Sequence, residues 1–196
     1  MVRTIDGDER RRVLAEAVWR IVRRDGLAAA SVRTVAAESG LSTGSVRHFF
    51  TTQHELLEFA MRQLFARVAA RIAESAAIGD PAERALAVLG EMMPLTDVSR
   101  DEAVVHFDFV VHSRLDPAFE AITQESFALI RNICRQVVEM LREHGRLHPD
   151  VDVEASATEL AALVDGLTVR LLFAPDALTP DQAREAVRRH LDRESP

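Results

Sequence analysis

Apolar residues recur three and four positions apart along most of this 196-residue chain. That spacing places them on one face of an α-helix. The alternation of polar and apolar residues that is typical of a half-buried strand is almost absent. We therefore predict an all-α protein. About nine helices are expected, at residues 8–25, 32–39, 43–49, 53–77, 81–92, 100–114, 118–144, 152–173 and 180–192.

Residues that start and stop helices support these boundaries. A Ser or Thr followed three positions later by an acid or amide fits a capping box, and an Asp just before a Pro is a second kind of helix start. Five starts follow, namely the pairs Thr52 with Glu55, Ser99 with Glu102 and Thr179 with Gln182, together with Asp80 and Asp116. Glycine closes helices in a left-handed conformation, and four glycines lie just past periodic runs, at Gly26, Gly40, Gly79 and Gly145.

Residues 31–50, SVRTVAAESGLSTGSVRHFF, have the spacing of a helix-turn-helix. Ser31 and Ser42 can cap two short helices, and Gly40 can take the positive φ of the turn. Ala36 is small where the helices cross, and an apolar wedge fixes their angle, formed by Val32, Val35, Leu41, Val46 and Phe49. The second helix then offers short polar side chains to a major groove. The alternative is a helical hairpin of a generic bundle, whose polar residues are merely solvated.

The segment from Gly26 to Leu57 resembles the DNA-binding signature of the TetR family, with its Ala-x-x-x-Gly turn, Ser-x-Gly recognition helix, aromatic-Phe pair and closing Leu-Leu. Betaine-type regulators of that family carry the same Arg-His-aromatic-Phe run. The chain departs from the common pattern at Arg47, where the family often has Tyr, and at Gln53, where it often has Lys. The helix-turn-helix and the resemblance together predict a DNA-binding set formed by Arg33, Thr34, Ser42, Thr43, Gly44, Ser45, Arg47, His48, Thr52 and Gln53.

Within that set, the resemblance assigns guanine reading to Arg33 and approach to the bases to Thr43 and Gly44. The family architecture also implies a DNA-binding domain at residues 1–52 and a domain for effector binding and dimerisation at 53–196. The last two helices resemble the family's dimer-forming pair. Small residues for close approach and apolar residues for the interface are Ala155, Ala161, Ala162 and Gly166 with Leu160, Leu163, Leu167, Leu171 and Phe173. The alternative is that these helices close the core of the monomer.

The helix expected at 100–114 is apolar on most faces, which is typical of a central helix. His106, Asp108 and His112 interrupt it, either as hydrogen-bonded core or edge residues or as polar groups of a ligand cavity. The resemblance implies such a cavity for a small, largely apolar effector. We name eight effector candidates for its lining, namely Met92, Met93, His106, Phe109, Val110, Phe127, Arg131 and Asp165. The chain has no Tyr, and Trp19 falls in the DNA-binding domain, so an aromatic cage for a quaternary ammonium is not supported.

The net charge of −7 is unevenly distributed. Residues 1–50 hold nine Arg and six Asp or Glu, whereas residues 51–196 hold fifteen Arg and twenty-five Asp or Glu. A basic N-terminal segment followed by an acidic segment is typical of a protein that binds phosphates only through its N-terminal part. The arginines at 10–12 either add an electrostatic anchor for DNA or are solvated residues of a first helical turn.

The sequence argues against several other classes. No stretch approaches the roughly 18 to 20 uncharged apolar residues of a membrane-spanning helix, and the first residues lack the apolar core of a signal peptide, so we expect a cytoplasmic protein without membrane interactions. Cys134, the single cysteine, is interpreted as a small buried residue rather than a reactive thiol. Residues 81–196 contain no nucleotide loop, metal-spaced cluster or nucleophile motif, so we expect no cofactor, metal or catalytic residue.

These observations favour a sequence-specific transcriptional regulator that is not an enzyme. The hypothesis is a homodimer that binds double-stranded operator DNA and represses transcription until a small-molecule effector releases it. Two alternatives stay open at this point. One is a small helical enzyme, for which only the clustered His and carboxylate residues argue, and the other is a DNA-binding protein without a ligand.

Overall fold

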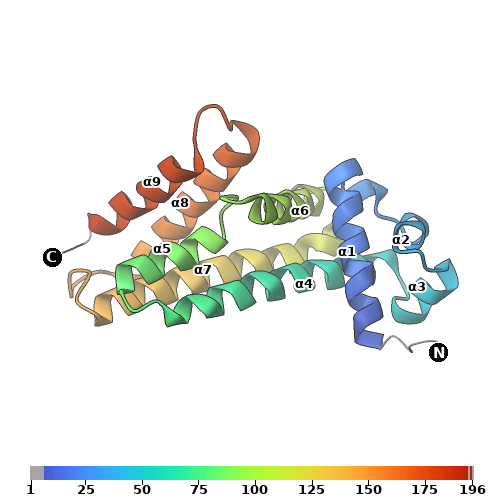
Figure 1. Ribbon diagram of the computed structural model, residues 1–196, viewed down its shortest axis with the longest axis horizontal. Helices are drawn as coiled ribbons and strands as arrows, with labels where there is room; N and C mark the ends of the chain where they lie inside the picture. Colours follow the sequence, from blue (N-terminus) through green and yellow to red (C-terminus); the bar gives the residue numbers. More distant parts are fainter. Residues whose placement is uncertain (1–6, 194, 196) are drawn as a thin grey trace. The chain divides into compact units, whose positions relative to one another are not determined.

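The computed structural model describes residues 7–193 and 195. In this part of the chain there are nine α-helices, three short 3-10 turns and no strand, which confirms the all-α prediction (Figure 1). The elements are α1 (Gly7–Asp25), η1 (Leu27–Ala29), α2 (Val32–Ser39), α3 (Thr43–Phe49), α4 (Gln53–Glu74), η2 (Ser75–Ala77), α5 (Pro81–Glu91), α6 (Asp97–Ser113), η3 (Pro117–Phe119), α7 (Glu120–Glu143), α8 (Val153–Phe173) and α9 (Pro180–Asp192).

The helices form two compact units. The first comprises residues up to 67 together with 104–124, and the second comprises 68–103 together with 125–196. Three helices, α4, α6 and α7, therefore contribute residues to both units. These units are defined by packing, so the functional division at residue 52 stays a prediction.

In the first unit, α1 packs against α2, and α2 packs against α3. Trp19 of α1 donates its indole N–H to the carbonyl oxygen of Ala60 on α4 at 3.0 Å, which ties these two helices together. The guanidinium of Arg67 lies over the Trp19 ring, 4.9 Å from its centroid. Helices α1, α2, α4 and α6 (Asp97–Ser113) contribute the buried apolar side chains of this unit, among them Leu14, Val18, Ile21, Val35, Leu56, Ala60, Leu64 and Phe109.

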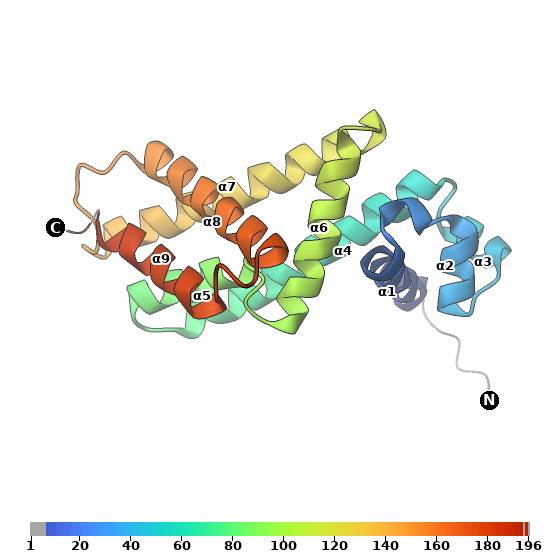
Figure 2. The ribbon, with the colours of Figure 1, turned by 90° about the horizontal axis from the view of Figure 1, so that it is seen from above.

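In the second unit, α8 and α9 lie side by side, and α9 also packs against α5 (Figure 2). One face of each helix is apolar and buried, as the helical spacing predicts. The core includes Ala85, Leu89, Met93, Cys134, Val138, Leu141, Leu160, Val164, Leu171, Val187 and Leu191. Cys134 is completely buried, and burial, with a smaller effect from Asp165, raises the pKa of its thiol to about 12. The interpretation of Cys134 as an inert core residue is confirmed.

Four of the five predicted helix starts are confirmed. Asp80, just before Pro81, accepts the N–H groups of Ala82 and Glu83, and Asp116, just before Pro117, accepts that of Ala118. Thr179 forms a reciprocal capping box with Gln182. The Thr52 hydroxyl accepts the N–H of Glu55 at 3.1 Å, although the Glu55 carboxylate returns to the N–H of Thr51 rather than of Thr52.

The predicted start at Ser99 is wrong. Helix α6 begins at Asp97, because Thr96 and Ser99 cap each other: each hydroxyl accepts the other residue's backbone N–H, at 3.0 and 3.1 Å. Glu102, the expected second member of the box, instead receives two hydrogen bonds from Arg71 of α4. A charge-assisted pair with a guanidinium is stronger than a bond to a backbone amide, so the tertiary partner prevails.

The end of the long helix at 53–77 also differs from expectation. Helix α4 stops at Glu74, a 3-10 turn follows, and Gly79 does not adopt a positive φ. The carbonyl of Ile78 accepts two N–H groups of Arg84 at 2.8 and 2.6 Å, which ties the segment before Gly79 to α5. The other three glycines predicted to close helices have φ of 82°, 71° and 67°, at Gly26, Gly40 and Gly145.

No helix in the described ranges has both the length and the apolar content needed to cross a membrane.

Candidate nucleic-acid interface

The helix-turn-helix forms as the sequence predicts. Ser31 caps α2 through the N–H of Thr34, and Ser42 caps α3 through the N–H of Ser45 at 3.1 Å. Gly40 between the two helices has φ 71° and ψ 17°, a conformation that side-chain-bearing residues rarely adopt. Its N–H binds back to the carbonyl of Ala37, which closes α2 within one turn.

The motif buries its apolar residues and exposes its polar ones. Val35, Ala36 and Val46 are buried at the crossing of α2 and α3, so the angle between the helices is fixed by packing. The predicted contact residues in this motif are exposed except Ser45, which is half-buried; the exposed ones are Arg33, Thr34, Ser42, Thr43, Gly44, Arg47 and His48. Short side chains at the start of α3 allow its backbone to approach a base pair closely.

The electrostatics of this surface favour a polyanion. No acidic residue occurs between Glu38 and Glu55, a stretch that contains Arg47 and two histidines. Glu38 itself is paired with Arg20 at 2.8 Å and with Arg24 at 3.2 Å. Hydrogen bonds from these two guanidiniums hold the pKa of the Glu38 carboxyl below its usual value. The acidic residue that precedes the reading helix in the chain is thus already paired with two guanidiniums.

Besides Ser42, which caps α3, three predicted contact residues also serve the fold. The Thr34 hydroxyl donates to the carbonyl of Ala29 at 2.6 Å, and Thr52 caps α4. Gln53 donates from Nε2 to the carbonyl of Ala30 at 3.0 Å, and sequence reasoning missed this bond because 23 residues separate the partners. One N–H of the Gln53 amide stays available for another acceptor, since the amide nitrogen carries two hydrogens.

The polar residues of α6 are hydrogen-bonded within the first unit. The Asp108 carboxylate accepts the backbone N–H of Leu27 at 3.1 Å, and a ring nitrogen of His112 lies 2.9 Å from the Asp108 carbonyl oxygen. For Asp108 and His112, the structure favours hydrogen-bonded packing over a role in a ligand cavity. The Asp108 bond joins residues 81 positions apart, so no local pattern could have predicted it.

The eight effector candidates are divided between the two units. His106, Phe109 and Val110 belong to the first, where Phe109 packs edge-on against Phe119. The other five belong to the second: Met92, Met93, Phe127, Arg131 and Asp165.

Among those five, Met93 is a fully buried core residue. Met92 packs against the same core, whereas Phe127 is partly exposed. Arg131 is exposed and pairs with Glu154 at 3.0 Å, and partial burial raises the pKa of Asp165. Their role in binding an effector stays a prediction.

His106 is expected to make the stability of the protein depend on pH. Its ring lies near those of Phe65 and Phe107, and although the residue keeps some exposed surface, burial lowers its pKa from 6.5 to about 4. Below pH 6.5, His106 is protonated in the unfolded chain but stays neutral in the folded chain down to about pH 4. Stability is therefore lost as the pH falls from 6.5 towards 4. We expect His106 to account for about 2 kcal/mol of lost unfolding free energy at pH 5.

Urea unfolding of His106→Gln at pH 7 and pH 5 measures this contribution. The variant should lose less stability between the two pH values than the wild type, because its amide does not titrate. His144→Gln, a matched change at an exposed position at the end of α7, should behave like the wild type. Equal pH dependence in His106→Gln and the wild type would contradict the prediction.

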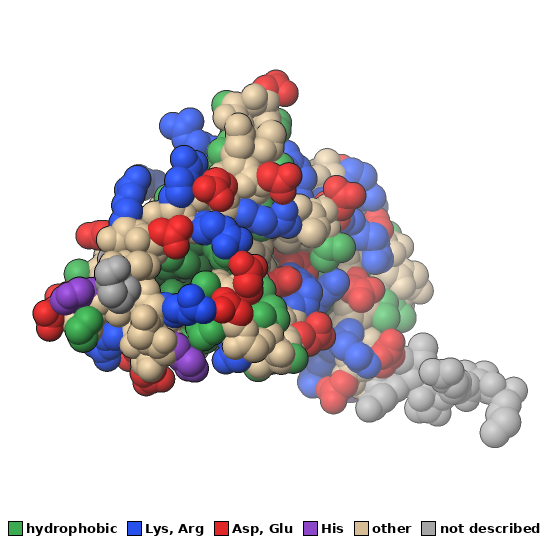
Figure 3. Space-filling view, turned by 60° about the vertical axis from the view of Figure 1, so that its left-hand side comes forward, with side chains coloured by type: hydrophobic (Ala, Val, Ile, Leu, Met, Phe, Trp, Pro, Cys, Tyr) green, Lys and Arg blue, Asp and Glu red, His purple; other side chains and the backbone are tan. Residues whose placement is uncertain are grey.

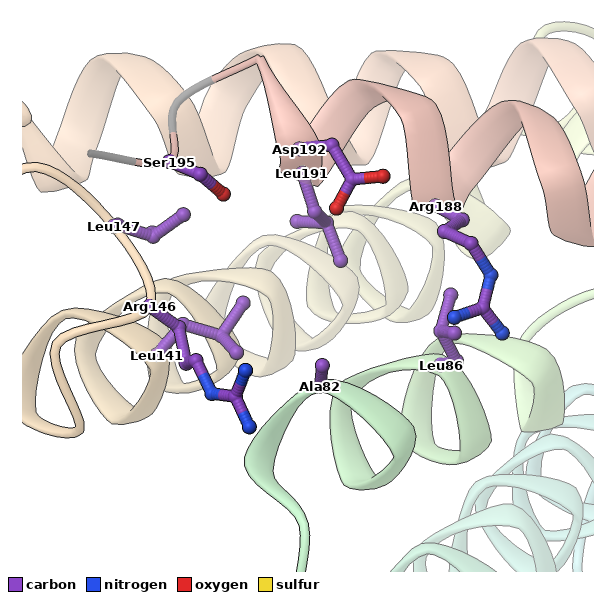
Figure 4. Close-up of a pocket in the computed structure, with 9 residues that line it drawn as sticks. All are labelled: Ala82, Leu86, Leu141, Arg146, Leu147, Arg188, Leu191, Asp192 and Ser195. Atoms are coloured by element: carbon purple, nitrogen blue, oxygen red, sulfur yellow. The ribbon is translucent and has the colours of Figure 1, made fainter.

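One small cavity opens between α5, α9 and the turn after α7 (Figure 4). Its volume is about 80 Å³, well below the roughly 300 Å³ at which cavities for drug-sized ligands begin. Leu86, Leu141 and Leu191 give it apolar walls, and the two arginines on its rim pair with nearby carboxylates, Arg146 with Asp80 and Arg188 with Glu83. None of the effector candidates lines this cavity.

The face drawn in Figure 3 intersperses Arg with acidic side chains, so charges of one sign do not gather there. In the part of the chain that the structure covers, no three His, Cys, Asp or Glu residues are placed to hold a metal ion.

Known proteins resemble this chain over nearly its whole length. Residues 81–196 match the family model of the C-terminal domain of BetI-type transcriptional repressors. The HTH-type transcriptional regulator PksA of Bacillus subtilis is 35% identical and aligns with 98% of this chain and 93% of its own. Two solved structures share the fold. A transcriptional regulator of Rhodococcus sp. Rha1 has a TM-score of 0.79 at 30% identity, covering 94% of this chain and 95% of its own. A regulator of Saccharomonospora viridis in complex with choline has a TM-score of 0.81 at 24% identity, covering 94% and 96%.

Proposed function

Because this chain belongs to the TetR family of transcriptional regulators, with a C-terminal domain of the BetI type, we propose that it is a homodimeric repressor that a small effector releases from a palindromic operator. Membership of the family makes it a DNA-binding regulator rather than an enzyme. Dimerisation and effector binding are typical of the family, while the residues that carry them in this chain are proposals.

The observation that carries the proposal is the capped helix-turn-helix. Its second helix begins with exposed Thr43 and Gly44, and the sequence has no acidic residue from 39 to 54. We propose that Thr43 and Gly44 meet base edges and that Arg33 reads a guanine. Arg47 and His48 then face phosphates, together with the free N–H groups at the start of α3.

The dimer is proposed to form through α8 and α9. Of the apolar residues predicted for this interface, Leu160, Leu167 and Leu171 are buried in the core of the monomer itself. The opposite face of α8 remains exposed and carries small or apolar residues, namely Ala155, Ala162, Gly166, Val169 and Phe173. A second copy packed on this face would form a two-fold four-helix interface, which can place two reading helices about 34 to 36 Å apart on one duplex.

Phe173→Glu is expected to weaken this dimer. Phe173 ends α8 with 73% of its surface exposed, and a carboxylate at an apolar interface loses hydration without gaining a partner. We expect the dimer dissociation constant to rise at least about tenfold, which equals 1.4 kcal/mol. Sedimentation at several protein concentrations measures the change.

Leu115→Glu is the matched control, because Leu115 is 78% exposed but follows α6 and belongs to neither α8 nor α9. It should sediment like the wild type. Equal dissociation in the two variants, or none in Phe173→Glu, would place the interface elsewhere.

The proposed effector is small and largely apolar, and the eight effector candidates are its proposed contacts. The Saccharomonospora protein binds choline. In this chain there is no Tyr, and Trp19 is already engaged with Ala60 and Arg67, so we do not extend that ligand to it. To lower operator affinity tenfold, an effector must prefer the released conformation by about 1.4 kcal/mol.

The proposed function is tested by selecting genomic fragments with the purified full-length protein and measuring the affinity of the selected duplexes at several salt concentrations. We expect a palindromic site whose affinity falls steeply with salt, because each phosphate contact releases counterions. The region upstream of the protein's own gene is included as a defined probe. Binding without preference for any palindromic duplex, or without salt dependence, would overturn the proposal.

A further inference from the structure

The carboxylate of Asp108 on α6 makes a long-range hydrogen bond inside the first compact unit. Its Oδ2 atom accepts the backbone N–H of Leu27 at 3.1 Å. Leu27 is buried and opens the turn η1, and the residue before it, Gly26, supplies no side-chain cap. An unpaired buried N–H is costly, so Asp108 takes the place of the missing cap from a distant part of the chain.

The backbone at Gly26 presents this N–H to the carboxylate. Gly26 has φ 82°, a conformation that favours glycine, and a Cβ built there would lie 3.7 Å from Oδ2 of Asp108. That distance is an ordinary van der Waals contact. A side chain at position 26 would therefore not clash with Asp108. Glycine is favoured there because of the positive φ, which orients the next N–H towards the carboxylate.

The short segment that Asp108 holds is bonded directly to the reading motif. The carbonyl of Ala29 accepts the Thr34 hydroxyl of α2 at 2.6 Å, and the carbonyl of Ala30 accepts the side-chain amide of Gln53 at 3.0 Å. The next residue is Ser31, the cap of α2. Residues 27–31 thus link the Asp108 carboxylate, through these hydrogen bonds, to the first turns of α2 and α4.

The first half of α6 is hydrogen-bonded within the second unit. In the second unit, Arg100 donates to the carbonyl of Leu171 at 3.0 Å, and Glu102 is bound by Arg71 through two hydrogen bonds. Asp108 follows Glu102 by less than two helical turns on the same helix. Asp108 itself belongs to the first unit, together with the residues 27–30 that it holds.

We infer that Asp108 is a positioning residue for operator binding, which holds the segment before α2 in the place that the reading helices require. This inference rests on the proposed function. The charge of Asp108 strengthens the bond to the Leu27 N–H. In this proposal Asp108 does not contact DNA. It affects the position of the reading helices and not the number of phosphates that the protein binds.

Asp108→Ala tests this inference with two readouts. In the free full-length protein, amide hydrogen exchange of residues 27–39 should become about tenfold faster, as expected for the loss of one charge-assisted hydrogen bond. Affinity for a duplex selected by the wild-type protein should fall about tenfold, with the salt dependence unchanged. Asp97→Ala, an exposed position in the first turn of the same helix, should change neither value.

Asp108→Asn keeps an acceptor oxygen and should restore most of both properties. If Asp108→Ala does not fold, the Asn variant serves in its place, with a loss of about threefold expected from the missing charge. Unchanged exchange in residues 27–39, or unchanged operator affinity with faster exchange, would overturn the inference. If the wild type selects no duplex, the proposed function fails, and the exchange measurement still decides whether Asp108 holds this segment.

Discussion

Arg47→Ala is expected to lower operator affinity by about tenfold per protomer and up to about a hundredfold for a dimer, while the fold stays intact. Arg47 is exposed on α3, where its side chain contributes to no core. Each lost phosphate contact also reduces the slope of log affinity against log salt by about 0.9, so the dimer should lose about two units of slope. Fluorescence anisotropy with the selected duplex at several salt concentrations measures both quantities.

The control is Arg142→Ala, which removes the same charge from an exposed position near the end of α7. It should leave affinity and slope close to those of the wild type, because Arg142 is not part of the helix-turn-helix and an exposed charge is screened by salt. A similar loss in both variants would mean that net charge, and not the reading helix, governs binding. An unchanged melting temperature in Arg47→Ala shows that the lost affinity does not come from unfolding.

Arg71→Ala is expected to cost about 3 kcal/mol of unfolding free energy. The Arg71 guanidinium binds both oxygens of the Glu102 carboxylate, at 2.6 and 3.1 Å, and one oxygen of Glu91 at 2.6 Å. The bonds to Glu102 and, more weakly, to Glu91 raise the pKa of Arg71 above its usual value. Only 10% of the Glu102 side chain is exposed, so removal of Arg71 leaves a buried carboxylate without its main partner.

Urea unfolding at neutral pH measures this effect, and Arg62→Ala is the matched control on the same helix. Arg62 pairs with Glu58 at 2.8 Å on the surface, where an ion pair contributes about 0.5 kcal/mol or less. Arg71→Ala combined with Glu102→Leu should recover much of the stability, since the buried charge is then absent. A loss in Arg71→Ala no larger than in Arg62→Ala would show that the cluster is only a surface pair.

The sequence alone determined the fold class and most of the helix boundaries. Helical periodicity and capping depend on residues within about four positions of each other, so they can be recognised without knowledge of the fold. Ser31, Gly40 and Ser42 predicted the helix-turn-helix for this reason, and the structure has its helices at the predicted residues. The exposure of Thr43 and Arg47 follows from the same local pattern.

Only the tertiary structure decided which partner each polar side chain takes. Glu102 matched a capping box as well as Glu55 did, yet it binds Arg71, which lies 31 residues away. Asp108 was open to two interpretations until its bond to Leu27 was seen. Such pairs form because folding removes the side chains from water and leaves them the acceptor or donor that is nearest in space.

The two faces of α8 show the same division. Apolar and small residues on this helix predicted packing, but their spacing did not say which face meets the monomer's own core. The structure buries Leu160 and Leu171 and leaves Gly166 and Phe173 exposed. Local spacing determines that a face is apolar, whereas the arrangement of distant helices determines what covers it, because burial depends on contacts between residues far apart in the chain.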